Sequence, residues 1–381
     1  MSKKILCVVG ARPNFMKIAP VIAALKVGPT PFEICLLHTG QHYDTAMNDQ
    51  FFTALNIPRP NINLDVGSGS HAVQTSEIMR RFEPVLDQEM PDAILVVGDV
   101  NSTIACALVA AKKGIKVIHV EAGLRSYDRA MPEEINRVLT DQISDILFTT
   151  EREAEENLHR EGIERQRVHF VGNVMIDTLK SQLPYATPVT TILGQAGVSP
   201  SFLGSKKAYA VLTLHRPANV DDVAVLGAVL SAIGKVSRSL PVIFPIHPRT
   251  RSRIEGFGLM ELITLANISL LPPQGYLEML GLMKDARMVL TDSGGIQEET
   301  TALGVPCITL RHNTERPITV TEGTNTIAGT DPEKIQAVVN EILQIGGKVG
   351  KAPEFWDGKA SHRIAAVLHD WFGRFPLHQV T

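Results

Sequence analysis

Residues 288–299 have the sequence MVLTDSGGIQEE, in which a short apolar run leads into a Ser-Gly-Gly turn and then a helical pattern. The run predicts a buried strand, and the pattern predicts a helix that begins near Ser293, Gly294 and Gly295. The first amides of a helix have no intrahelical partners and lie at the positive end of its dipole, which favours an anion such as phosphate. An ordinary helix start on an α/β domain has the same pattern, so the turn alone leaves both interpretations open.

Glu299 strengthens the anion interpretation, because it follows Gly295 by four residues and therefore lies one turn along the same helical face. A carboxylate there can accept hydrogen bonds from ribose hydroxyls. One helix would then contact both the diphosphate and the sugar of a nucleotide.

Short β-branched runs alternate with helical patterns along almost the whole chain, which is typical of parallel α/β layers. The expected strands form two series: 5–9, 33–38, 93–97, 116–120, 146–149 and 168–171, then 209–214, 241–246, 268–271, 288–290, 307–310 and 326–328. A segment rich in Pro, Gly, Ser and Thr, 183–207, lies between them. Two such α/β halves would bind ligands in the cleft between them, at the carboxyl ends of the strands.

These patterns predict an α/β protein with an N-terminal domain at 1–172 and a C-terminal domain at 173–360. The last segment, 361–381, carries an apolar stripe that includes Ile364 and Leu368 and predicts a helix that packs back on the N-terminal domain.

The bulk composition excludes several classes of partner. The 381 residues are 44% hydrophobic and carry a net charge of −3, which gives no basis for binding nucleic acid or an anionic membrane. No signal-peptide pattern and no apolar stretch of about 20 residues is present. The four cysteines lack metal-ligand spacing, which indicates reduced thiols, and we expect a cytoplasmic protein without a metal.

Three acidic residues stand where strands end or helices begin. Asp99 follows an apolar run and a glycine, and capping of the next helix is its alternative role. Glu121 leaves an apolar strand just before a glycine turn, which a structural role explains less easily. Glu133 follows Pro132 at a helix start, where acids are also common without catalytic function.

Cations and histidines occupy similar positions. Arg12 and Lys17 lie at the start of the first helix, where a positive charge opposes the helix dipole unless an anion lies between them. His215 and His247 end strands in the second half, where an imidazole can act as acid, base or phosphate donor. Solvated surface charges and structural histidines are the alternatives. The sequence contains no GxGxxG, P-loop, HExxH or nucleophile-elbow pattern.

Taken together, six segments resemble the non-hydrolysing UDP-N-acetylglucosamine 2-epimerases over nearly the whole chain. They are residues 10–13 (GARP), 98–99 (GD), 119–125 (HVEAGLR), 132–137 (PEEINR), 291–299 (TDSGGIQEE) and 314–317 (TERP). The resemblance implies a glycosyltransferase B-type fold, which consists of two Rossmann-like domains with parallel sheets and an interdomain cleft.

The resemblance also implies a reaction. UDP is eliminated from carbon 1 with loss of the carbon-2 proton, and 2-acetamidoglucal is reprotonated on its other face as UDP adds back. No redox cofactor is required, because the leaving group returns. Asp99, Glu121 and Glu133 would supply the acid–base groups, with His215 near the diphosphate or the leaving oxygen.

Further residues match the substrate contacts of the family. Gln274 matches a uracil contact and Glu299 a ribose contact. The other expected substrate and phosphate contacts are Arg12, Lys17, Ser293, Gly294, Gly295 and Arg316. Gln41 and His42 match a loop that holds an activating second UDP-GlcNAc in bacterial members, and His247 is a further candidate loop contact. The family also implies a homodimer.

Some positions depart from the family pattern, notably Met279, where an aromatic residue is frequent, and 67–71, beside the activator loop. Methionine can still pack on a base, but more loosely. The departure at 67–71 brings allosteric activation into question, and the same loop keeps open a modified substrate such as a 2,3-diacetamido uronate UDP-sugar. A glycosyltransferase of the same fold is the main alternative class. A hydrolysing epimerase also remains open, whereas a non-catalytic sensor is disfavoured because several carboxylates near a diphosphate would only weaken binding.

Overall fold

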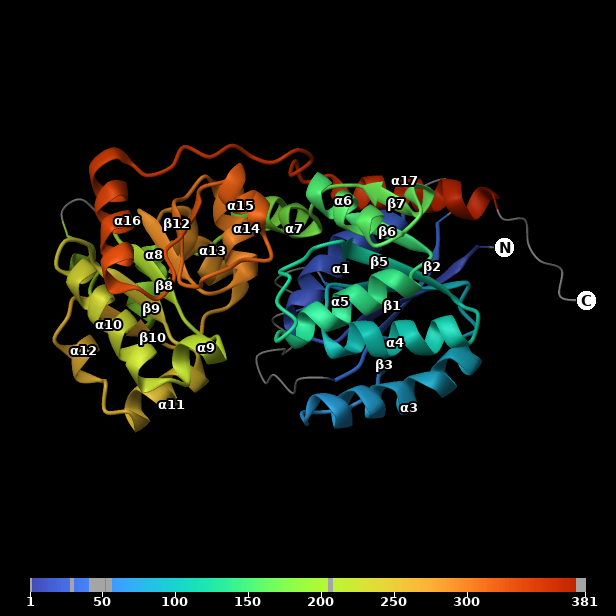
Figure 1. The fold of residues 1–381 in the computed structure, drawn as a ribbon, viewed down its shortest axis with the longest axis horizontal. Helices are drawn as coiled ribbons and strands as arrows, with labels where there is room; N and C mark the ends of the chain where they lie inside the picture. The colour runs from blue at the N-terminus through green and yellow to red at the C-terminus, as the bar shows by residue number, and fades with distance from the viewer. Residues whose placement is uncertain (1, 28–30, 41–51, 53–56, 205–207, 375–381) are drawn as a thin grey trace, which may run out of the picture. The chain divides into compact units, whose positions relative to one another are not determined.

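The chain forms two compact α/β units in a computed structural model that describes residues 2–27, 31–40, 52, 57–204 and 208–374 (Figure 1). Unit 1 comprises Met1–Thr178 and Glu354–Thr381, and unit 2 comprises Leu179–Pro353. Each unit has its own parallel sheet covered by helices, which confirms the α/β class with two Rossmann-like halves. The division expected from the sequence, at 172 and 360, stays a prediction.

Unit 1 contains a seven-stranded sheet in the order β3-β2-β1-β4-β5-β6-β7. Its strands are β1 (Lys4–Val9), β2 (Glu33–His38), β3 (Ile62–Asn63), β4 (Ala93–Val97), β5 (Lys116–Ala122), β6 (Ile146–Thr149) and β7 (Val168–Phe170). The central strands are buried on both faces, as β-branched and aliphatic runs in a parallel sheet require. The direction of the strand order reverses between β1 and β4, which is the point where such sheets bind ligands.

The helices of unit 1 cover both faces of this sheet. They are α1 (Arg12–Leu25), α3 (His71–Glu89), α4 (Asn101–Lys112), α5 (Pro132–Ile143), α6 (Arg152–Arg160), α7 (Val174–Gln182), which continues into unit 2, and α17 (Ala360–Arg374). Helices α3, α4 and α5 lie side by side, and α17 packs against α1 (Figure 1). The carboxylate of Asp177 accepts hydrogen bonds from the amides of Ala360 and Ser361, which ties the start of α17 to unit 1.

Unit 2 repeats the same topology with six strands in the order β10-β9-β8-β11-β12-β13. The strands are β8 (Ala210–Thr213), β9 (Val242–Pro245), β10 (Ile268–Leu271), β11 (Met288–Thr291), β12 (Cys307–Thr309) and β13 (Asn325–Ile327). The helices are α8 (Val189–Gln195), α9 (Pro217–Val220), α10 (Val223–Ser237), α11 (Pro248–Gly256), α12 (Glu261–Thr264), α13 (Tyr276–Lys284), α14 (Gly294–Leu303), α15 (Pro317–Thr321) and α16 (Pro332–Ile345). Here the strand order reverses between β8 and β11.

Two local features were not visible in the sequence pattern. Strand β3 has only two residues, which is too short to give a periodic signal. The segment 183–204 lacks periodicity, yet it includes α8 and packs Ile192, Leu193 and Leu203 into the core of unit 2. The twelve strands expected from the sequence all correspond to strands of the two sheets, within a few residues at their ends.

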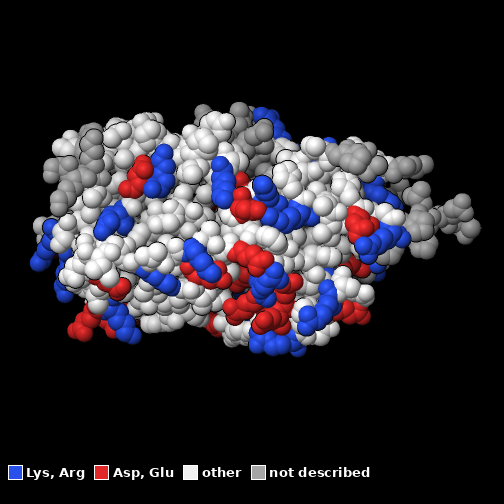
Figure 2. Space-filling model, turned by 90° about the horizontal axis from the view of Figure 1, so that it is seen from above, with Lys and Arg blue, Asp and Glu red and all other residues white. Residues whose placement is uncertain are grey.

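The described helices include none with the length and apolar character needed to cross a bilayer. Acidic and basic side chains are intermixed over the face of the molecule that Figure 2 shows. That face therefore presents no extended surface of one charge to a polyanion.

Candidate functional site

Three candidate residues of unit 1 lie at one edge of its sheet. Arg12 lies after the end of β1, Asp99 lies after the end of β4, and Glu121 is the second-to-last residue of β5. These three strands are neighbours in the order β1-β4-β5, and all are parallel. The fold therefore brings residues separated by more than one hundred positions to the same carboxyl edge, at the point where the strand order reverses.

Glu121 has an unusual backbone conformation for a glutamate. Its φ angle is 73°, and the pairing of β5 with β6 shifts register between Val120 and Ala122. Left-handed conformations of residues other than glycine cost free energy and persist only where surrounding contacts impose them, as at functional sites. The bulge turns the Glu121 side chain toward α1.

Lys17 of α1 binds this carboxylate. Its Nζ lies 2.7 Å from Oε1 and 2.6 Å from Oε2 of Glu121, and only 11% and 1% of the two side chains are exposed. A buried carboxylate needs such a partner to stay charged. The structure thus places Lys17 next to the acid, whereas the sequence predicted a phosphate contact for it; that contact stays a prediction.

Asp99 is held by two residues of α5. Arg137 donates from Nε to Oδ2 of Asp99 at 3.1 Å and also contacts this oxygen through Nη2, while Asn136 donates to the Asp99 carbonyl at 2.9 Å. Arg137 is itself fixed by Glu134, whose Oε2 lies 2.8 Å from Nη1. These contacts set the orientation of the Asp99 carboxylate, of which 22% is exposed.

Glu133 differs from the other two acids in its surroundings. It is half-buried in the first turn of α5. Among the residues that the structure describes, it has no hydrogen-bond or ion-pair partner. Its carboxylate is therefore available to a ligand.

The loop after β1 is organised by Asn14. Its Oδ1 accepts hydrogen bonds from the amides of Gly10 and Ala11 at 3.2 and 2.9 Å, and its Nδ2 donates to the carbonyl of Val97 at 3.0 Å. The side chain thus joins the ends of β1 and β4 across the point where the strand order reverses. Arg12 comes directly after Ala11, is the first residue of α1 and is half-buried.

In unit 2, the Ser-Gly-Gly turn forms the helix start that the sequence predicted. Strand β11 ends at Thr291, Ser293 is the N-cap of α14, and no side chain of the described residues caps its amides. A Cβ on Gly294 would lie 2.5 Å from Oε1 of Glu315, so a larger residue here would displace this carboxylate, which is paired with Arg311. A Cβ on Gly295 would meet nothing within 4 Å, so the first turn of α14 faces open space.

His215 is oriented by a buried aspartate that the sequence analysis had not selected. The His215 Nδ1 lies 2.9 Å from Oδ1 of Asp292, which is fully buried and also accepts hydrogen bonds from the amides of His215 and Arg216. Burial alone would raise the pKa of Asp292, but its contacts with His215 and these amides lower it. Asp292 thus holds the imidazole through Nδ1 and leaves the other ring nitrogen, Nε2, on the side away from Asp292; 39% of the His215 side chain is exposed. The ring of His247 lies 6.1 Å from that of His215.

A cluster of buried charges lies beside the first turn of α14. Arg316 binds Glu298 at 2.8 Å, and Arg311 binds Glu315 at 2.9 Å. Burial alone would raise the pKa of Glu315, but the guanidinium groups of Arg316 and Arg311 bring it down to about 2. Arg316 is therefore fixed close to the helix start where the sequence predicted a phosphate.

Glu299 lies one turn further along α14 in an apolar setting. Burial, with a smaller contribution from Glu298, raises its pKa to about 7, and the nearby Tyr276 hydroxyl only partly offsets this. Gln274 lies in the loop between β10 and α13, and its Nε2 donates to the carbonyl of Pro272 at 2.8 Å. Its amide oxygen remains directed away from that bond.

Not every candidate can be placed. Gln41 and His42 lie outside the described residues. Asp292, Arg137 and Asn14 were missed as site residues, although each lies inside or beside a motif that the sequence analysis singled out. The available signal was a polar or charged residue within or beside these motifs.

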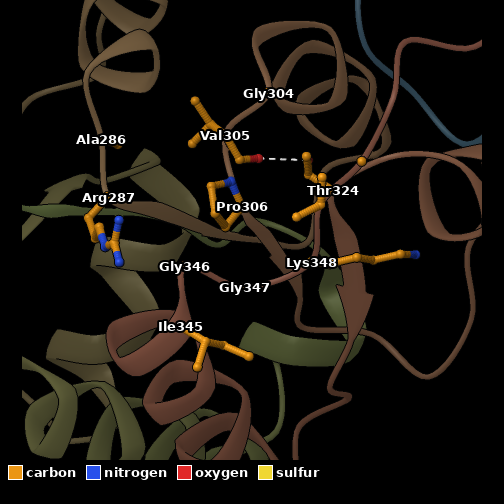
Figure 3. A pocket seen from close by; sticks show the side chains of 12 residues that line it. Ala286, Arg287, Gly304, Val305, Pro306, Thr324, Ile345, Gly346, Gly347 and Lys348 are labelled. Atoms are coloured by element: carbon orange, nitrogen blue, oxygen red, sulfur yellow. Dashed lines mark hydrogen bonds between the residues drawn. The ribbon is translucent and has the colours of Figure 1, made fainter.

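A cavity of about 450 Å³ in unit 2 lies away from these residues (Figure 3). It is lined by the amino end of β12 and by the glycine-rich turn after α16, including Val305, Gly346 and Gly347. Thr324 donates a hydrogen bond to the Val305 carbonyl at its border, and Lys348 points away from it (Figure 3). The cavity is at the opposite edge of the sheet from His215 and the start of α14.

Each unit thus gathers its polar candidates at the carboxyl edge of a Rossmann-like sheet: unit 1 offers carboxylates, and unit 2 a histidine and an uncapped helix start. These features define an enzyme of the glycosyltransferase B-like fold class that handles a nucleotide-linked substrate.

Comparison with known proteins identifies the family. Residues 26–369 match the family model for UDP-N-acetylglucosamine 2-epimerase. A relative of that name from Methanocaldococcus jannaschii is 43% identical over 371 residues, which cover 96% of this chain and 98% of the relative. The chain therefore belongs to the UDP-N-acetylglucosamine 2-epimerase family, whose members are isomerases that act on UDP-sugars.

Two further comparisons bear on the substrate. The crystal structure of the Methanocaldococcus jannaschii enzyme in complex with UDP-GlcNAc and UDP is 42% identical, covers 96% of this chain and 99% of that one, and has a TM-score of 0.86. A UDP-2,3-diacetamido-2,3-dideoxy-D-glucuronate 2-epimerase from Pseudomonas aeruginosa is 40% identical over 372 residues, which cover 96% of this chain and 99% of the relative.

Proposed function

We propose that the protein interconverts UDP-GlcNAc and UDP-ManNAc. A base removes the carbon-2 proton, the bond between carbon 1 and the diphosphate oxygen breaks, and the electron pair of the C–H bond forms the double bond of 2-acetamidoglucal. UDP then adds back to carbon 1 while an acid delivers a proton to the other face of carbon 2. Atoms and charge balance without a cofactor.

The strained, buried Glu121 with its Lys17 partner is the observation that carries this proposal. An acid–base residue must be held in a fixed direction toward the reacting proton, and the direction of Glu121 is imposed here by contacts rather than by local preference. Asp99, which follows the neighbouring strand β4, and Glu133 on α5 supply the further carboxylates that proton transfer at both faces of carbon 2 requires.

The nucleotide half of the substrate is assigned to unit 2. The uncapped start of α14 at Ser293, Gly294 and Gly295 suits the diphosphate, with Arg316 as a fixed cation nearby. Glu299 would accept the ribose hydroxyls, and Gln274 would contact the uracil. His215, held by Asp292, would donate to the leaving diphosphate oxygen.

A modified UDP-sugar is the second candidate substrate. It is supported by the similarity to the diacetamido glucuronate epimerase from Pseudomonas aeruginosa, which is nearly as high as that to the UDP-GlcNAc enzymes. The segment 67–71, which departs from the family pattern, also favours it.

The decisive experiment is to incubate the protein with UDP-GlcNAc in D₂O and to follow carbon 2 by NMR. Deuterium at carbon 2 together with UDP-ManNAc supports the proposal, whereas free ManNAc and UDP would indicate a hydrolysing enzyme. No exchange, with UDP-GlcNAc shown to bind, would exclude this substrate, and the diacetamido uronate is then tested in the same way. Turnover that requires an added acceptor would indicate a glycosyltransferase.

Four further properties belong to the same proposal. We propose a homodimer, as the resemblance implies, and a cytoplasmic location, supported by four buried cysteines that are all free. His247 is proposed as a loop contact because its ring faces the same edge as His215. Gln41 and His42 are proposed as contacts of a second nucleotide.

A further inference from the structure

A fully buried polar group lies beneath the carboxyl ends of β4 and β5. It consists of His119 on β5, Asp141 on α5 and Arg125, whose side chains are at most 1% exposed. None of the three was selected from the sequence as a site residue. Buried charges are retained only where several hydrogen bonds satisfy them, so their partners indicate what the group holds in place.

Asp141 accepts hydrogen bonds from three donors. His119 Nδ1 lies 2.7 Å from its Oδ1, while the Gly123 amide and Arg125 Nη2 lie 3.1 and 2.7 Å from its Oδ2. Gly123 comes two residues after Glu121, so this carboxylate fixes the turn that follows the strained residue. Arg125 is in turn held by Glu161 through two contacts, at 2.8 and 2.6 Å.

His119 extends the same connection to the neighbouring strand. Its Nε2 lies 2.9 Å from the carbonyl of Gly98, the residue directly before Asp99. The ring therefore lies between the Asp141 carboxylate and the Gly98 carbonyl, with one nitrogen next to each. The Gly98 amide also donates to the Val120 carbonyl at 3.1 Å, which joins this turn to β5 a second time.

The chain turns at the ends of β4 and β5 both need such support. Gly98, Glu121 and Gly123 have φ angles of 70°, 73° and 81°, and a glutamate does not adopt this conformation by local preference. Asp141 contacts the Gly123 amide directly and the Gly98 carbonyl through His119. One buried carboxylate therefore holds both strand-end turns at a fixed separation.

We infer that Asp141 is a positioning residue for the epimerisation: acting through His119 and the Gly123 amide, it sets the position of the Asp99 and Glu121 carboxylates relative to each other. This inference rests on the proposed function. A proton abstracted at one face of carbon 2 and replaced at the other needs two groups at a defined separation, and a displacement of about 1 Å can lower a rate by about 10²-fold.

The test is Asp141→Asn, assayed by carbon-2 deuterium exchange and by UDP binding. The amide cannot accept from all three donors, so kcat is expected to fall about 10²-fold. The affinity for UDP is expected to stay at the wild-type value, because the proposed nucleotide contacts are in unit 2. Wild-type kcat per folded molecule in this variant would overturn the inference.

Three more variants keep the test independent of stability. His119→Ala removes the contact with Gly98 and is expected to lower kcat as Asp141→Asn does, while His119→Gln, whose amide can still donate to that carbonyl, recovers part of the rate. Asp145→Asn is the control, since Asp145 accepts a hydrogen bond from the Val117 amide at 2.9 Å, at the opposite end of β5 from Gly123. It is expected to keep the wild-type kcat; an equal loss there would show that any weakening of β5 suffices and would overturn the inference. Absence of exchange in the wild-type protein would instead refute the proposed function.

Discussion

Replacement of Lys17 by methionine tests the buried ion pair with Glu121 directly. The change keeps the apolar stem and removes the ammonium group, which leaves the Glu121 carboxylate, 1% exposed, without its counter-charge. Breaking a buried pair in this way costs about 3–5 kcal/mol, against about 0–1 kcal/mol for an exposed pair. Since Lys17 is itself 11% exposed, we expect about 3 kcal/mol, at the lower end of the buried range.

The loss is expected to depend on pH. In the variant, burial without a cation favours the neutral form of Glu121, so its folded-state pKa rises above the unfolded value. The destabilisation is then fully present at high pH and becomes smaller as the pH falls and the carboxyl takes up a proton in the folded state. The double variant Lys17→Met, Glu121→Gln has no buried charge and is expected to regain most of the lost stability.

Both tryptophans of the chain, Trp356 and Trp371, lie in unit 1, so their fluorescence reports the unfolding of the unit that contains the pair. Urea titrations at several pH values give the free energy of unfolding for the wild type, both single variants and the double variant. A loss below about 1 kcal/mol that is independent of pH, without recovery in the double variant, would refute the buried-pair argument. A large loss of UDP affinity with unchanged stability would instead support the phosphate contact that the sequence predicted for Lys17.

Three other predictions concern unit 2. Gly294→Ala is expected to weaken UDP binding and lower the thermal stability, because its Cβ would meet Glu315, whereas Gly295→Ala is expected to weaken UDP binding alone; calorimetric titration and melting curves of both variants check this. The pKa of Glu299 is about 7 in the folded state against an ordinary 4.5, so between these pH values stability falls as pH rises, by roughly 3 kcal/mol in all. In Glu299→Gln, urea titrations at several pH values are expected to show that this fall in the free energy of unfolding with pH is absent. An unchanged fall would contradict the raised pKa of Glu299. Asp292→Asn is expected to lower kcat by about 10²-fold or more through loss of the His215 orientation, with little change in KM, as steady-state assays would show.

The sequence predicted the architecture well because parallel α/β folds carry a strong local signal. Each central strand is a short aliphatic run such as 93–97, buried on both faces, and each is followed by a helical pattern. The start of α14 was predicted for the same reason: its strand, its turn and its helix are consecutive in the chain. By contrast, α8 contributes only Ile192 and Leu193 to the core, and two residues are too few to show a period.

The contacts of the acids could not be predicted from local patterns. Lys17 and Glu121 are 104 residues apart, and Asp99 and Arg137 are 38 residues apart. A short stretch of sequence contains each of these residues but not its distant partner. Lys17 was therefore predicted to contact phosphate, because of its position at a helix start. The φ angle of Glu121 could not be predicted either, because a glutamate in the sequence gives no indication of a left-handed conformation.

The two units place different residues at the same topological position. In unit 1 the chain after β4 passes through Asp99 into α4, whose first residues, Asn101, Ser102 and Thr103, have buried side chains. In unit 2 the equivalent chain after β11 places Asp292 in the interior against His215 and begins α14 with two glycines. A carboxylate that points outward repels a diphosphate, and an uncapped helix start attracts one. In the proposed function, proton transfer in unit 1 and anion binding in unit 2 therefore follow from the residue type that each unit places at the end of its fourth strand in the sheet order.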